Sequence, residues 1–574
     1  MPMRYFCLAC DYDGTIARDG QVSASTIDAL KKVSASGRKL VLVTGRELDD
    51  LIRVFPQISL FDLVVAENGA LLYRPSNQEQ KLLGEPPSPD FVAELRRRGV
   101  TPLSVGKSIV ATWHPNESVV LEVIRNLGLE LQVIFNKNAV MILPSGVNKG
   151  TGLLAALDEL GLSPHNVVAA GDAENDHAFL SISECSVALA NALPALKERA
   201  DFVTAASHGA GVEELIEQLL TKDLLGLSPR LARHRILLGH THQGAPCEIL
   251  PYGSRLIVAG PSGSGKSTTV AAILERLVEK KYQVCLIDPE GDYDDFKELV
   301  TLGGPDRIPG VSEVLEVLTN RGHSLSINLL GVPMADRPSY FVNLVSRIQE
   351  LRAKTGRPHW IVIDEAHHLL PAAQDAANLA IPQEFGSMAL ITVHPDHVAR
   401  AALNSINGLI AVGPEPAEVI RQFNSGSGKN LQIDSQFARA AVPGEILYWV
   451  FSDPQGPVNV VLQSAKTELR RHRRKYAAGE LGEDKSFYFR GPDGKLNLRA
   501  QNMNLFAQLA EGVDEDTWIH HLRNADYSKW LRESVKDQAI ADEVAVIEKN
   551  ADLAPSESRA KVVESIRKHY TAQA

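Results

Sequence analysis

The strongest constraint on the fold of this chain is a glycine-rich run, residues 260–268 (GPSGSGKST), which directly follows the apolar residues 256–259. Glycines at these spacings allow successive backbone N–H groups to surround a phosphate at the N-terminus of a helix. The run therefore requires a strand, a tight loop and a helix, in that order. It predicts a P-loop nucleotide site in a parallel α/β sheet.

The residues of this loop carry specific expectations. Lys266 should reach the β- and γ-phosphates of ATP, and the Ser267 hydroxyl should bind Mg²⁺. A second apolar run, residues 360–363, is followed by Asp364 and Glu365. Asp364 should hold Mg²⁺ through water, and Glu365 should orient or deprotonate the attacking water. Glu365 favours ATP hydrolysis over binding alone. The expected nucleotide site comprises Gly260, Ser262, Gly263, Ser264, Gly265, Lys266, Ser267, Thr268 and Asp364.

Residues 1–222 show a second pattern, in which short apolar runs alternate with amphipathic helical segments, as in a parallel doubly wound sheet. Polar residues follow these runs or begin the helices after them: Asp11, Asp13, Thr44, Lys149, Asp172 and Asp176. The carboxyl ends of parallel strands share one edge of a sheet, where open α/β sheets bind ligands. Carboxylates at such an edge suit Mg²⁺, which prefers hard oxygen ligands.

Taken in order, these motifs resemble the haloacid-dehalogenase superfamily of phosphatases, in its Cof-like subclass IIB, whose cap is inserted between the second and third motifs. The resemblance implies that Asp11 attacks phosphorus and that Asp13 protonates the leaving oxygen and then activates water. It implies that Thr44 and Lys149 bind the phosphoryl group. A small phosphorylated substrate follows, with a sugar phosphate as the family's usual class. The same fold also supports phosphotransferases and mutases.

The resemblance also assigns the metal. Magnesium is expected among Asp11, the backbone carbonyl of Asp13, Asp172 and Asp176, where it would clamp phosphoryl oxygens. The residues expected to support this site are Gly45, Arg46, Asn68 and Asn175.

Two further segments, residues 286–293 (LIDPEGDY) and 364–371 (DEAHHLLP), resemble the HerA-type branch of P-loop ATPases over about 235–460. This resemblance implies a polar sensor at Thr392 or His394. It also implies an arginine from a neighbouring subunit, with Arg400 or Arg421 as candidates, and hence a homo-oligomer. The N-terminal barrel of HerA is replaced here by the phosphatase, so a hexameric ring and DNA translocation do not follow.

We therefore expect an α/β multidomain chain in three parts. Residues 1–222 form a Rossmann-like phosphatase core with a small α/β cap at about 75–148, and 235–462 form the P-loop ATPase sheet. Residues 466–574 form a basic segment, a hairpin and a mostly helical interaction region.

Composition limits the partners. Because the net charge is −11, nucleic acid could bind only at a local basic patch, and the candidate is the segment 466–499. The favoured interpretation of this segment is instead a solvated helix followed by a half-buried hairpin.

The five cysteines are scattered, with Cys7 and Cys10 interpreted as core residues, and this usage indicates a reducing compartment. No signal peptide or membrane-length apolar run is evident, so we expect a cytoplasmic protein without membrane contact. Three histidine pairs could suggest zinc, but none has a second pair at zinc-ligand spacing. They are His240 and His242, His367 and His368, and His520 and His521.

The preferred hypothesis is a bifunctional enzyme with Mg²⁺-dependent phosphatase and ATPase activities. Two alternatives stay open. One is a nucleic-acid end-processing phosphatase with a P-loop partner domain. The other is an ATP-driven DNA motor or switch whose phosphatase domain only binds.

Overall fold

The computed structural model describes residues 3–136, 138–294, 296–373, 386–434, 437, 444–463, 465–466, 481, 486–535, 537–550 and 553–570. The chain divides into two compact units, Met1–Gly291 with Glu298–Ala465, and Asp292–Lys297 with Lys466–Ala574. Within the described ranges, no helix has both the length and the apolar character needed to cross a membrane.

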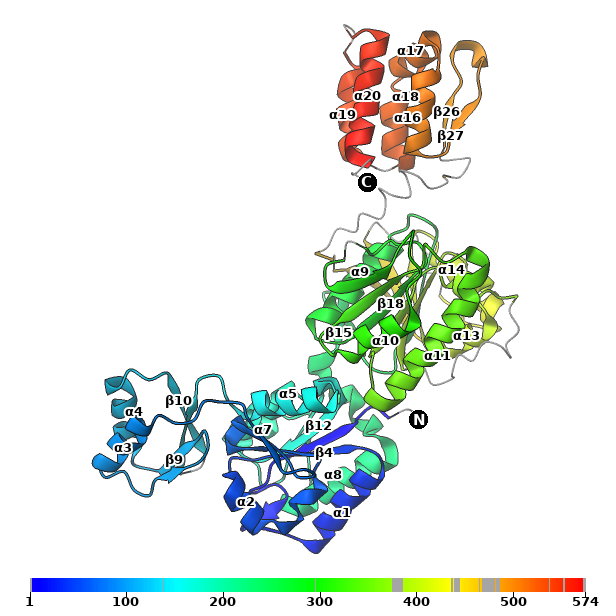
Figure 1. Ribbon diagram of the computed structural model, residues 1–574. Helices are drawn as coiled ribbons and strands as arrows, with labels where there is room; N and C mark the ends of the chain where they lie inside the picture. Colours follow the sequence, from blue (N-terminus) through cyan, green and yellow to red (C-terminus); the bar gives the residue numbers. More distant parts are fainter. Residues whose placement is uncertain are drawn as a thin grey trace. The chain divides into compact units, whose positions relative to one another are not determined.

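The first unit begins with an eight-stranded sheet of order β14-β13-β12-β1-β4-β5-β6-β7 (Figure 1). Its strands are β1 (Cys7–Cys10), β4 (Lys39–Val43), β5 (Leu63–Ala66), β6 (Leu71–Arg74), β7 (Glu79–Leu82), β12 (Val167–Gly171), β13 (Cys185–Ala188) and β14 (Phe202–Val203). The helices are α1 (Ala24–Ala35), α2 (Leu48–Val54), α5 (Lys149–Leu160), α6 (His177–Ile182), α7 (Pro194–Arg199) and α8 (His208–Lys222). Strand β1 is central, paired in parallel with β4 and β12.

The alternation of side chains along β1 fills both faces of this sheet. Cys10 belongs to one hydrophobic cluster and Cys7 to the other. The two cysteines therefore pack into opposite faces, as the strand pattern predicts, and the core interpretation of this C-x-x-C pair is confirmed.

The cap is a separate four-stranded sheet of order β10-β11-β9-β8 with two helices. Its elements are α3 (Pro89–Arg97), β8 (Ser104–Val105), β9 (Val110–Trp113), α4 (Glu117–Asn126), β10 (Leu131–Asn136) and β11 (Ala139–Pro144). Strand β7 pairs with β6 of the main sheet, so the cap begins beyond it and later than the expected start near 75. An exposed edge strand made mostly of consecutive polar residues gives no sequence signal of which sheet it joins.

Two short 3₁₀ helices, Leu225–Arg230 and Ala232–His234, connect the phosphatase to the next sheet. Leu224, Leu227 and Leu231 are buried in the same hydrophobic cluster as β1 and α8. This connecting segment is therefore packed onto the core of the first sheet.

The ATPase sheet has the order β16-β15-β25-β24-β23-β17-β22-β21-β18-β20-β19. Its strands are β15 (Ile236–His240), β16 (Pro246–Ile249), β17 (Arg255–Ala259), β18 (Val284–Asp288), β19 (Leu299–Gly303), β20 (Ser324–Asn328), β21 (Trp360–Ile363), β22 (Ser387–Thr392), β23 (Gly408–Val412), β24 (Glu445–Val450) and β25 (Val458–Leu462). The helices are α9 (Lys266–Glu279), α10 (Val311–Thr319), α11 (Arg337–Thr355), α12 (Ala366–Leu369), α13 (Arg400–Ser405) and α14 (Pro416–Ser427). Strands β17 to β23 pair in parallel, whereas β24, β25, β15 and β16 pair antiparallel.

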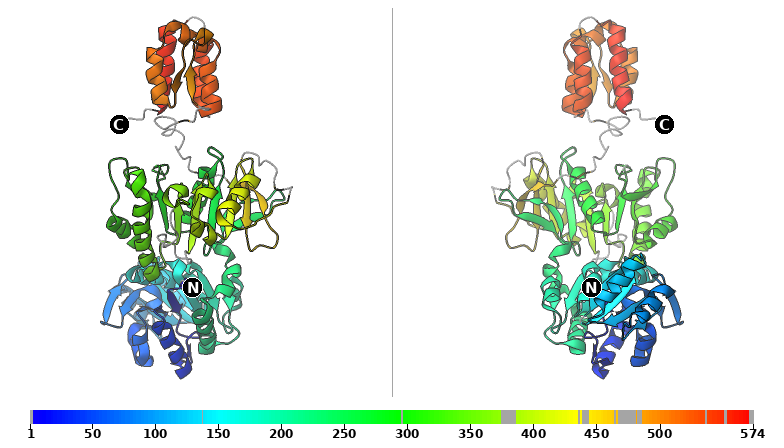
Figure 2. Two further views of the ribbon diagram at one scale, coloured as in Figure 1. Left: turned by 90° about the vertical axis from the view of Figure 1, so that its right-hand side faces the viewer. Right: turned by 90° about the vertical axis from the view of Figure 1, so that its left-hand side faces the viewer.

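The second unit contains a short hairpin, β26 (Phe487–Phe489) and β27 (Leu498–Ala500), with helices on either side of it (Figure 2). These helices are α16 (Met503–Gly512), α17 (Glu515–Arg523), α18 (Asp526–Trp530), α19 (Gln538–Glu548) and α20 (Pro555–Tyr570). Trp518, Tyr527 and Trp530 are buried in its core, which makes them packing residues of this unit.

Candidate active sites

The phosphatase site is built around Lys149, the first residue of α5. Its Nζ lies 2.6 Å from Asp11 Oδ1 and 2.6 Å from Asp176 Oδ1, and all three side chains are buried. Asn148 caps the helix and fixes the direction in which Lys149 leaves it. Burial by itself would lower the pKa of Lys149, but Asp11 and Asp176 outweigh it and hold this pKa above its ordinary value.

The loop after β12 completes the acidic group. Asp176 Oδ2 accepts hydrogen bonds of 2.8 Å from the backbone N–H groups of Asp172 and Ala173. Thr15 and Asn191 donate to the Asp172 carboxylate. Asp176 therefore orients both the lysine and the backbone that carries Asp172.

These carboxylates fit a hard divalent cation. Ligand oxygens of Asp11, Asp172 and Asp176 all lie within 4.8 Å of one another. Burial, followed by the charge of Asp176, raises the pKa of Asp11 well above its ordinary value, with Lys149 opposing. A cation between Asp11 and Asp172 would lower this pKa and keep Asp11 ionised as a nucleophile. The donor set is therefore suited to Mg²⁺.

Asp13 is held differently from Asp11. Arg46 donates from Nε to Asp13 Oδ2 at 2.6 Å and from Nη2 to Asp13 Oδ1 at 2.7 Å, and its Nη1 bonds Asp50 at 2.6 Å. This two-pronged pair fixes the plane of the Asp13 carboxylate at the mouth of the site. The sequence placed Arg46 among the supporting residues but gave no sign of this pairing.

Glycine is required where the loop after Asp13 passes the carboxylate of Asp172. Gly14 has φ of +87°, and a Cβ there would lie 2.3 Å from Asp172 Oδ2. The glycine therefore lets the loop approach the acidic group closely.

Thr44 and its neighbours lie beside the cap. Thr44 is buried at the end of β4, and its Oγ1 accepts the Arg46 N–H at 3.1 Å. A Cβ on Gly45 would meet Met141 of β11 at 3.1 Å, so the cap sheet reaches this loop. Asn175 donates to Asn68 at 3.0 Å and joins the two supporting loops. The predicted phosphatase residues thus converge on one edge of the sheet.

The second site lies between β17 and α9. Lys266 donates to the carbonyl oxygens of Gly260 and Pro261, both at 2.9 Å, so its ammonium group lies over the loop. Gly263 and Gly265 have φ of +75° and +103°, which L side chains rarely adopt. Ser267 is buried in the first turn of α9.

Asp364 and Glu365 follow β21, two strands away from β17 and next to β22. Both are buried, and Asp364 Oδ1 accepts the Glu365 N–H at 2.9 Å. Thr392 ends β22 opposite Ala259 and lies 3.1 Å from His367 Nδ1. His367 also lies 3.5 Å from Glu365 Oε2, which makes it a neighbour of the expected base that the sequence interpretation did not single out.

His367 lies beside two other histidines, His368 and His394, with ring centroids 4.1 and 6.0 Å from its own. Burial, and then His368 and His394, lower the pKa of His367 to about 4. A neutral His367 can hydrogen-bond Thr392 through Nδ1 without adding charge beside Glu365.

The candidate arginines differ in their contacts. Arg400 is bonded to the Ser427 carbonyl at 3.2 Å, whereas Arg421 is exposed on α14 and paired with Glu418 at 2.7 Å. Both arginines are exposed, so they differ in what they bond: Arg400 a backbone carbonyl, and Arg421 a carboxylate on its own helix.

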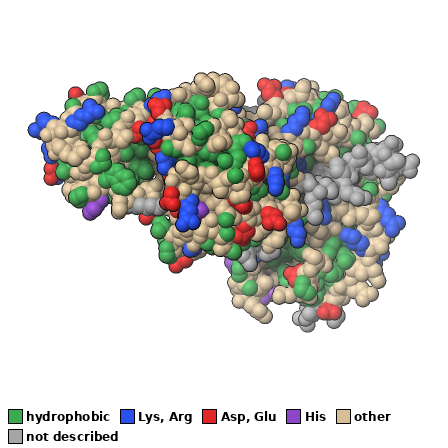
Figure 3. All heavy atoms as spheres, turned by 90° about the horizontal axis from the view of Figure 1, so that it is seen from below, with side chains coloured by type: hydrophobic (Ala, Val, Ile, Leu, Met, Phe, Trp, Pro, Cys, Tyr) green, Lys and Arg blue, Asp and Glu red, His purple; other side chains and the backbone are tan. Residues whose placement is uncertain are grey.

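The basic C-terminal segment gives little support for nucleic acid. Arg470 to Lys475 lie outside the described residues. Of the hairpin aromatics, Phe487 and Phe489 are buried, while Tyr488 lies under Arg490 at 5.2 Å. Elsewhere in the chain, on the face seen from below in Figure 3, Lys and Arg side chains are interspersed with Asp and Glu.

A parallel α/β core that presents two aspartates, a buried lysine and an acidic loop at one edge is the arrangement expected of a phosphoryl-transfer enzyme. The family model for haloacid dehalogenase-like hydrolases matches residues 8–95 and 121–216. A phosphoglycolate phosphatase from Methanothermobacter thermautotrophicus is 32% identical over 221 residues, covering 37% of this chain and 98% of the relative. The chain belongs to the haloacid dehalogenase-like hydrolases.

Further comparisons extend this picture. A phosphoglycolate phosphatase from Halorubrum lacusprofundi is 30% identical over 226 residues, covering 38% of this chain and 97% of the relative. A solved haloacid dehalogenase-like hydrolase from Bacteroides thetaiotaomicron has 19% identity and a TM-score of 0.33, covering 38% of this chain and 99% of that one. Residues 253–352 match the family model of the central domain of helicase HerA. Both predicted family resemblances are confirmed.

Proposed function

We propose that this protein is a bifunctional enzyme that hydrolyses a small phosphomonoester with residues 1–222 and ATP with residues 235–462. The observation that carries the first activity is the Lys149 ammonium between Asp11 and Asp176, 2.6 Å from each, beside Asp172. This arrangement brings together a nucleophile, positive charge for phosphoryl oxygens and a set of oxygen ligands at one sheet edge.

In the proposed reaction, an Asp11 carboxylate oxygen attacks phosphorus and forms an aspartyl-phosphate, while the ester oxygen leaves with a proton from Asp13. Asp13 then takes a proton from water, which attacks the acyl-phosphate phosphorus and releases inorganic phosphate and free Asp11. Lys149 and Thr44 bind phosphoryl oxygens in both steps. Mg²⁺ held by Asp11, Asp172 and the Asp13 carbonyl would supply the charge that offsets repulsion between nucleophile and substrate.

For the substrate, we propose a small phosphorylated carboxylic acid, with phosphoglycolate as the first compound to test. The support is that both relatives described above are phosphoglycolate phosphatases and align over nearly their whole length. Sugar phosphates, the usual class for the superfamily, are the direct comparison.

The test is a set of kcat/KM values with Mg²⁺ for phosphoglycolate, sugar phosphates, nucleotides and 3′- or 5′-phosphorylated oligonucleotides. Asp11→Asn should lower turnover on the best substrate by on the order of a thousandfold or more, because the nucleophile is lost. Lys266→Ala is the matched control and should leave phosphatase turnover near that of the wild type. Oligonucleotides as the best substrates would favour the end-processing alternative, and turnover retained by Asp11→Asn would contradict the mechanism.

For the second activity, the buried Asp364–Glu365 pair beside the P-loop supports ATP hydrolysis. Glu365→Gln should bind ATP and hydrolyse it slowly, because it lacks the water-activating carboxylate. Lys266→Ala should bind ATP weakly. The measurement is nucleotide binding by calorimetry together with phosphate release. Wild-type hydrolysis by Glu365→Gln would show that another residue is the base.

A further inference from the structure

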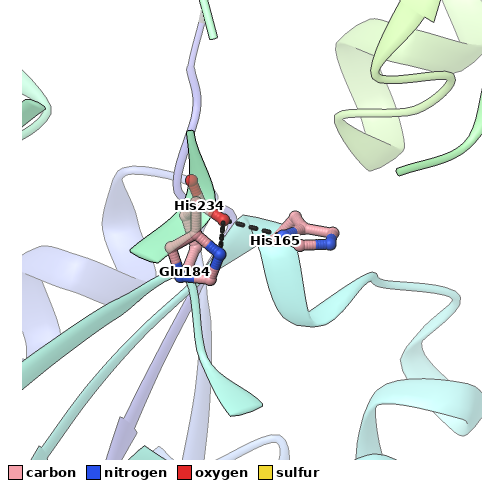
Figure 4. Close-up of side chains that lie close together, drawn as sticks. All are labelled: His165, Glu184 and His234. Carbon is pink, nitrogen blue, oxygen red and sulfur yellow. Dashed lines mark hydrogen bonds and ion pairs between the residues drawn. The ribbon is translucent and has the colours of Figure 1, made fainter. Parts of the chain in front are cut away.

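A second group of potential metal ligands lies at the other end of the phosphatase sheet from the Asp11 site. His165 precedes β12, Glu184 precedes β13, and His234 ends the connector that leads to the ATPase sheet. Ligand atoms of the three lie within 4.8 Å of one another, and Glu184 stands between the two histidines (Figure 4). The side chains of Glu184 and His165 are 1% and 8% exposed.

The hydrogen bonds of His165 leave a lone pair facing a carboxylate. His165 Nε2 lies 2.7 Å from the backbone carbonyl of Lys280, which only accepts, so this nitrogen carries the hydrogen. In a neutral ring, Nδ1 is then bare, yet it lies 2.7 Å from Glu184 Oε2. Two acceptors at this separation need a cation between them, either a metal ion or a second proton on the ring.

The surroundings of the group match those of metal ligands in proteins. A metal-binding histidine usually donates its other N–H to a carbonyl or carboxylate, and a metal-binding carboxylate is itself hydrogen-bonded. His165 donates to Lys280, while Arg4 bonds Glu184 Oε1 and Tyr282 OH lies 3.0 Å from Glu184 Oε2. Tyr282 also stacks on His165 with ring centroids 3.7 Å apart. Arg4 leaves Glu184 one oxygen for a metal.

A cavity adjoins His165 and Glu184. The cavity, of about 350 Å³, is lined by His165, Glu184 and Tyr282, together with Tyr252 and His359. It provides room for a water molecule as an additional ligand.

We propose that His165 Nδ1, Glu184 Oε2 and His234 Nδ1 bind one divalent transition-metal ion, with Zn²⁺ the best match to two imidazoles and a carboxylate. Bond lengths of about 2.0–2.1 Å in a tetrahedral site separate neighbouring ligand atoms by roughly 3.3–3.4 Å. The His234 Nδ1 to Glu184 Oε2 distance of 3.5 Å fits this, and the His165 contact of 2.7 Å would widen on binding. Tyr282 or water completes the site.

Such an ion would tie the connector to the phosphatase. His234 lies directly before β15, the first strand of the ATPase sheet, and Lys280 and Tyr282 follow α9. Metal binding would therefore hold together segments of the phosphatase, the connector and the ATPase. The site is structural in this proposal and takes no part in either hydrolysis.

The test uses the full-length, tag-free protein in millimolar Mg²⁺, which keeps the Asp11 site filled. After treatment with chelator, Zn²⁺ is titrated by calorimetry, and Co²⁺ is added to read the visible absorption of tetrahedral nitrogen and oxygen ligation. We expect one tight equivalent and a higher melting temperature with Zn²⁺. His234→Ala, with its ring 12% exposed, and Glu184→Gln should weaken binding by on the order of a hundredfold and remove the thermal shift.

Two controls separate this site from others. Asp172→Asn alters the phosphatase cluster and should keep the tight equivalent, and His323→Ala removes an exposed histidine and should do the same. Wild-type protein without a tight equivalent, together with a doubly protonated His165 ring by ¹⁵N NMR at neutral pH, would overturn the proposal by showing that a proton fills the contact. Equal Zn²⁺ binding by Glu184→Gln and wild type would overturn it as well.

Discussion

Lys149 is the residue on which the phosphatase site depends, because it faces Asp11 and Asp176 at once. Buried charges are costly without a partner, and removal of Lys149 would leave both buried carboxylates without their shared countercharge. The same contacts suit Lys149 to bind a phosphoryl group. Its ammonium group stays positively charged and is fixed where phosphoryl oxygens would arrive.

Gly14 offers a prediction about how closely the nucleophile loop must approach the metal residues. Gly14→Ala should lower phosphatase kcat/KM by on the order of a hundredfold, because the new Cβ would overlap the Asp172 carboxylate. Gly37→Ala is the matched control, since Gly37 has φ of +85° and no atom within 4 Å of an added Cβ. Both variants carry a positive-φ strain of about 1 kcal/mol. Enzyme assays and thermal melts separate strain from overlap, and equal losses of activity would contradict the prediction.

At the scale of elements, the cap is attached by a buried carboxylate. Glu67, after β5, accepts hydrogen bonds from the backbone N–H groups of Lys107, Ser108 and Ile109, at 3.0, 2.7 and 3.1 Å. These three residues lie in the turn between β8 and β9, so one side chain of the core holds a hairpin turn of the cap sheet. The cap is thereby fixed in direction near Thr44 and Gly45.

We expect Glu67→Ala to destabilise the protein by about 1–3 kcal/mol, because it leaves buried backbone donors without a partner. The loosened cap should also raise KM more than it lowers kcat. Asp62→Ala, which removes an acidic residue at the other end of β5, is a comparison for general destabilisation. Calorimetric melting and steady-state kinetics provide the measurement. A Glu67→Ala protein with unchanged melting temperature and KM would show that these bonds do not hold the cap.

At the scale of the whole molecule, two proposed hydrolytic sites share one chain, and no arginine is assigned to the γ-phosphate at the proposed ATPase site. Arg421 is exposed on α14, and the ion pair described for it is with Glu418. A neighbouring subunit could replace this surface contact. Exposed pairs of this kind contribute little stability, so exchanging the partner costs little.

We therefore expect ATPase activity per subunit to rise with protein concentration, and Arg421→Ala to lower it on the order of a thousandfold without weakening nucleotide binding. Arg400→Ala is the control, because Arg400 already bonds the Ser427 carbonyl within its own chain. Light scattering and ATPase assays over the same dilution series provide the measurement. A monomer with full activity would show that no neighbouring subunit is required.

The nucleotide loop and the acidic motifs could be predicted from the sequence because their chemistry is local. Residues 260–268 need glycines at fixed spacing, and Asp11 and Asp13 directly follow their strand, so neighbours along the chain define the pattern. Strand periodicity likewise placed Cys7 and Cys10 in the core. These features are set by interactions over a few residues, and such interactions leave a regular signal in the sequence.

Other features were decided by tertiary structure, because they join residues far apart in the chain. The pairing of Arg46 with Asp13, the hold of Glu67 on the cap and the meeting of His165, Glu184 and His234 have no spacing that repeats or can be recognised. The same is true of β7, whose sheet is chosen by its neighbour β6 rather than by its own residues. Directional contacts between distant side chains depend on how helices and sheets pack, so only the folded chain determines them.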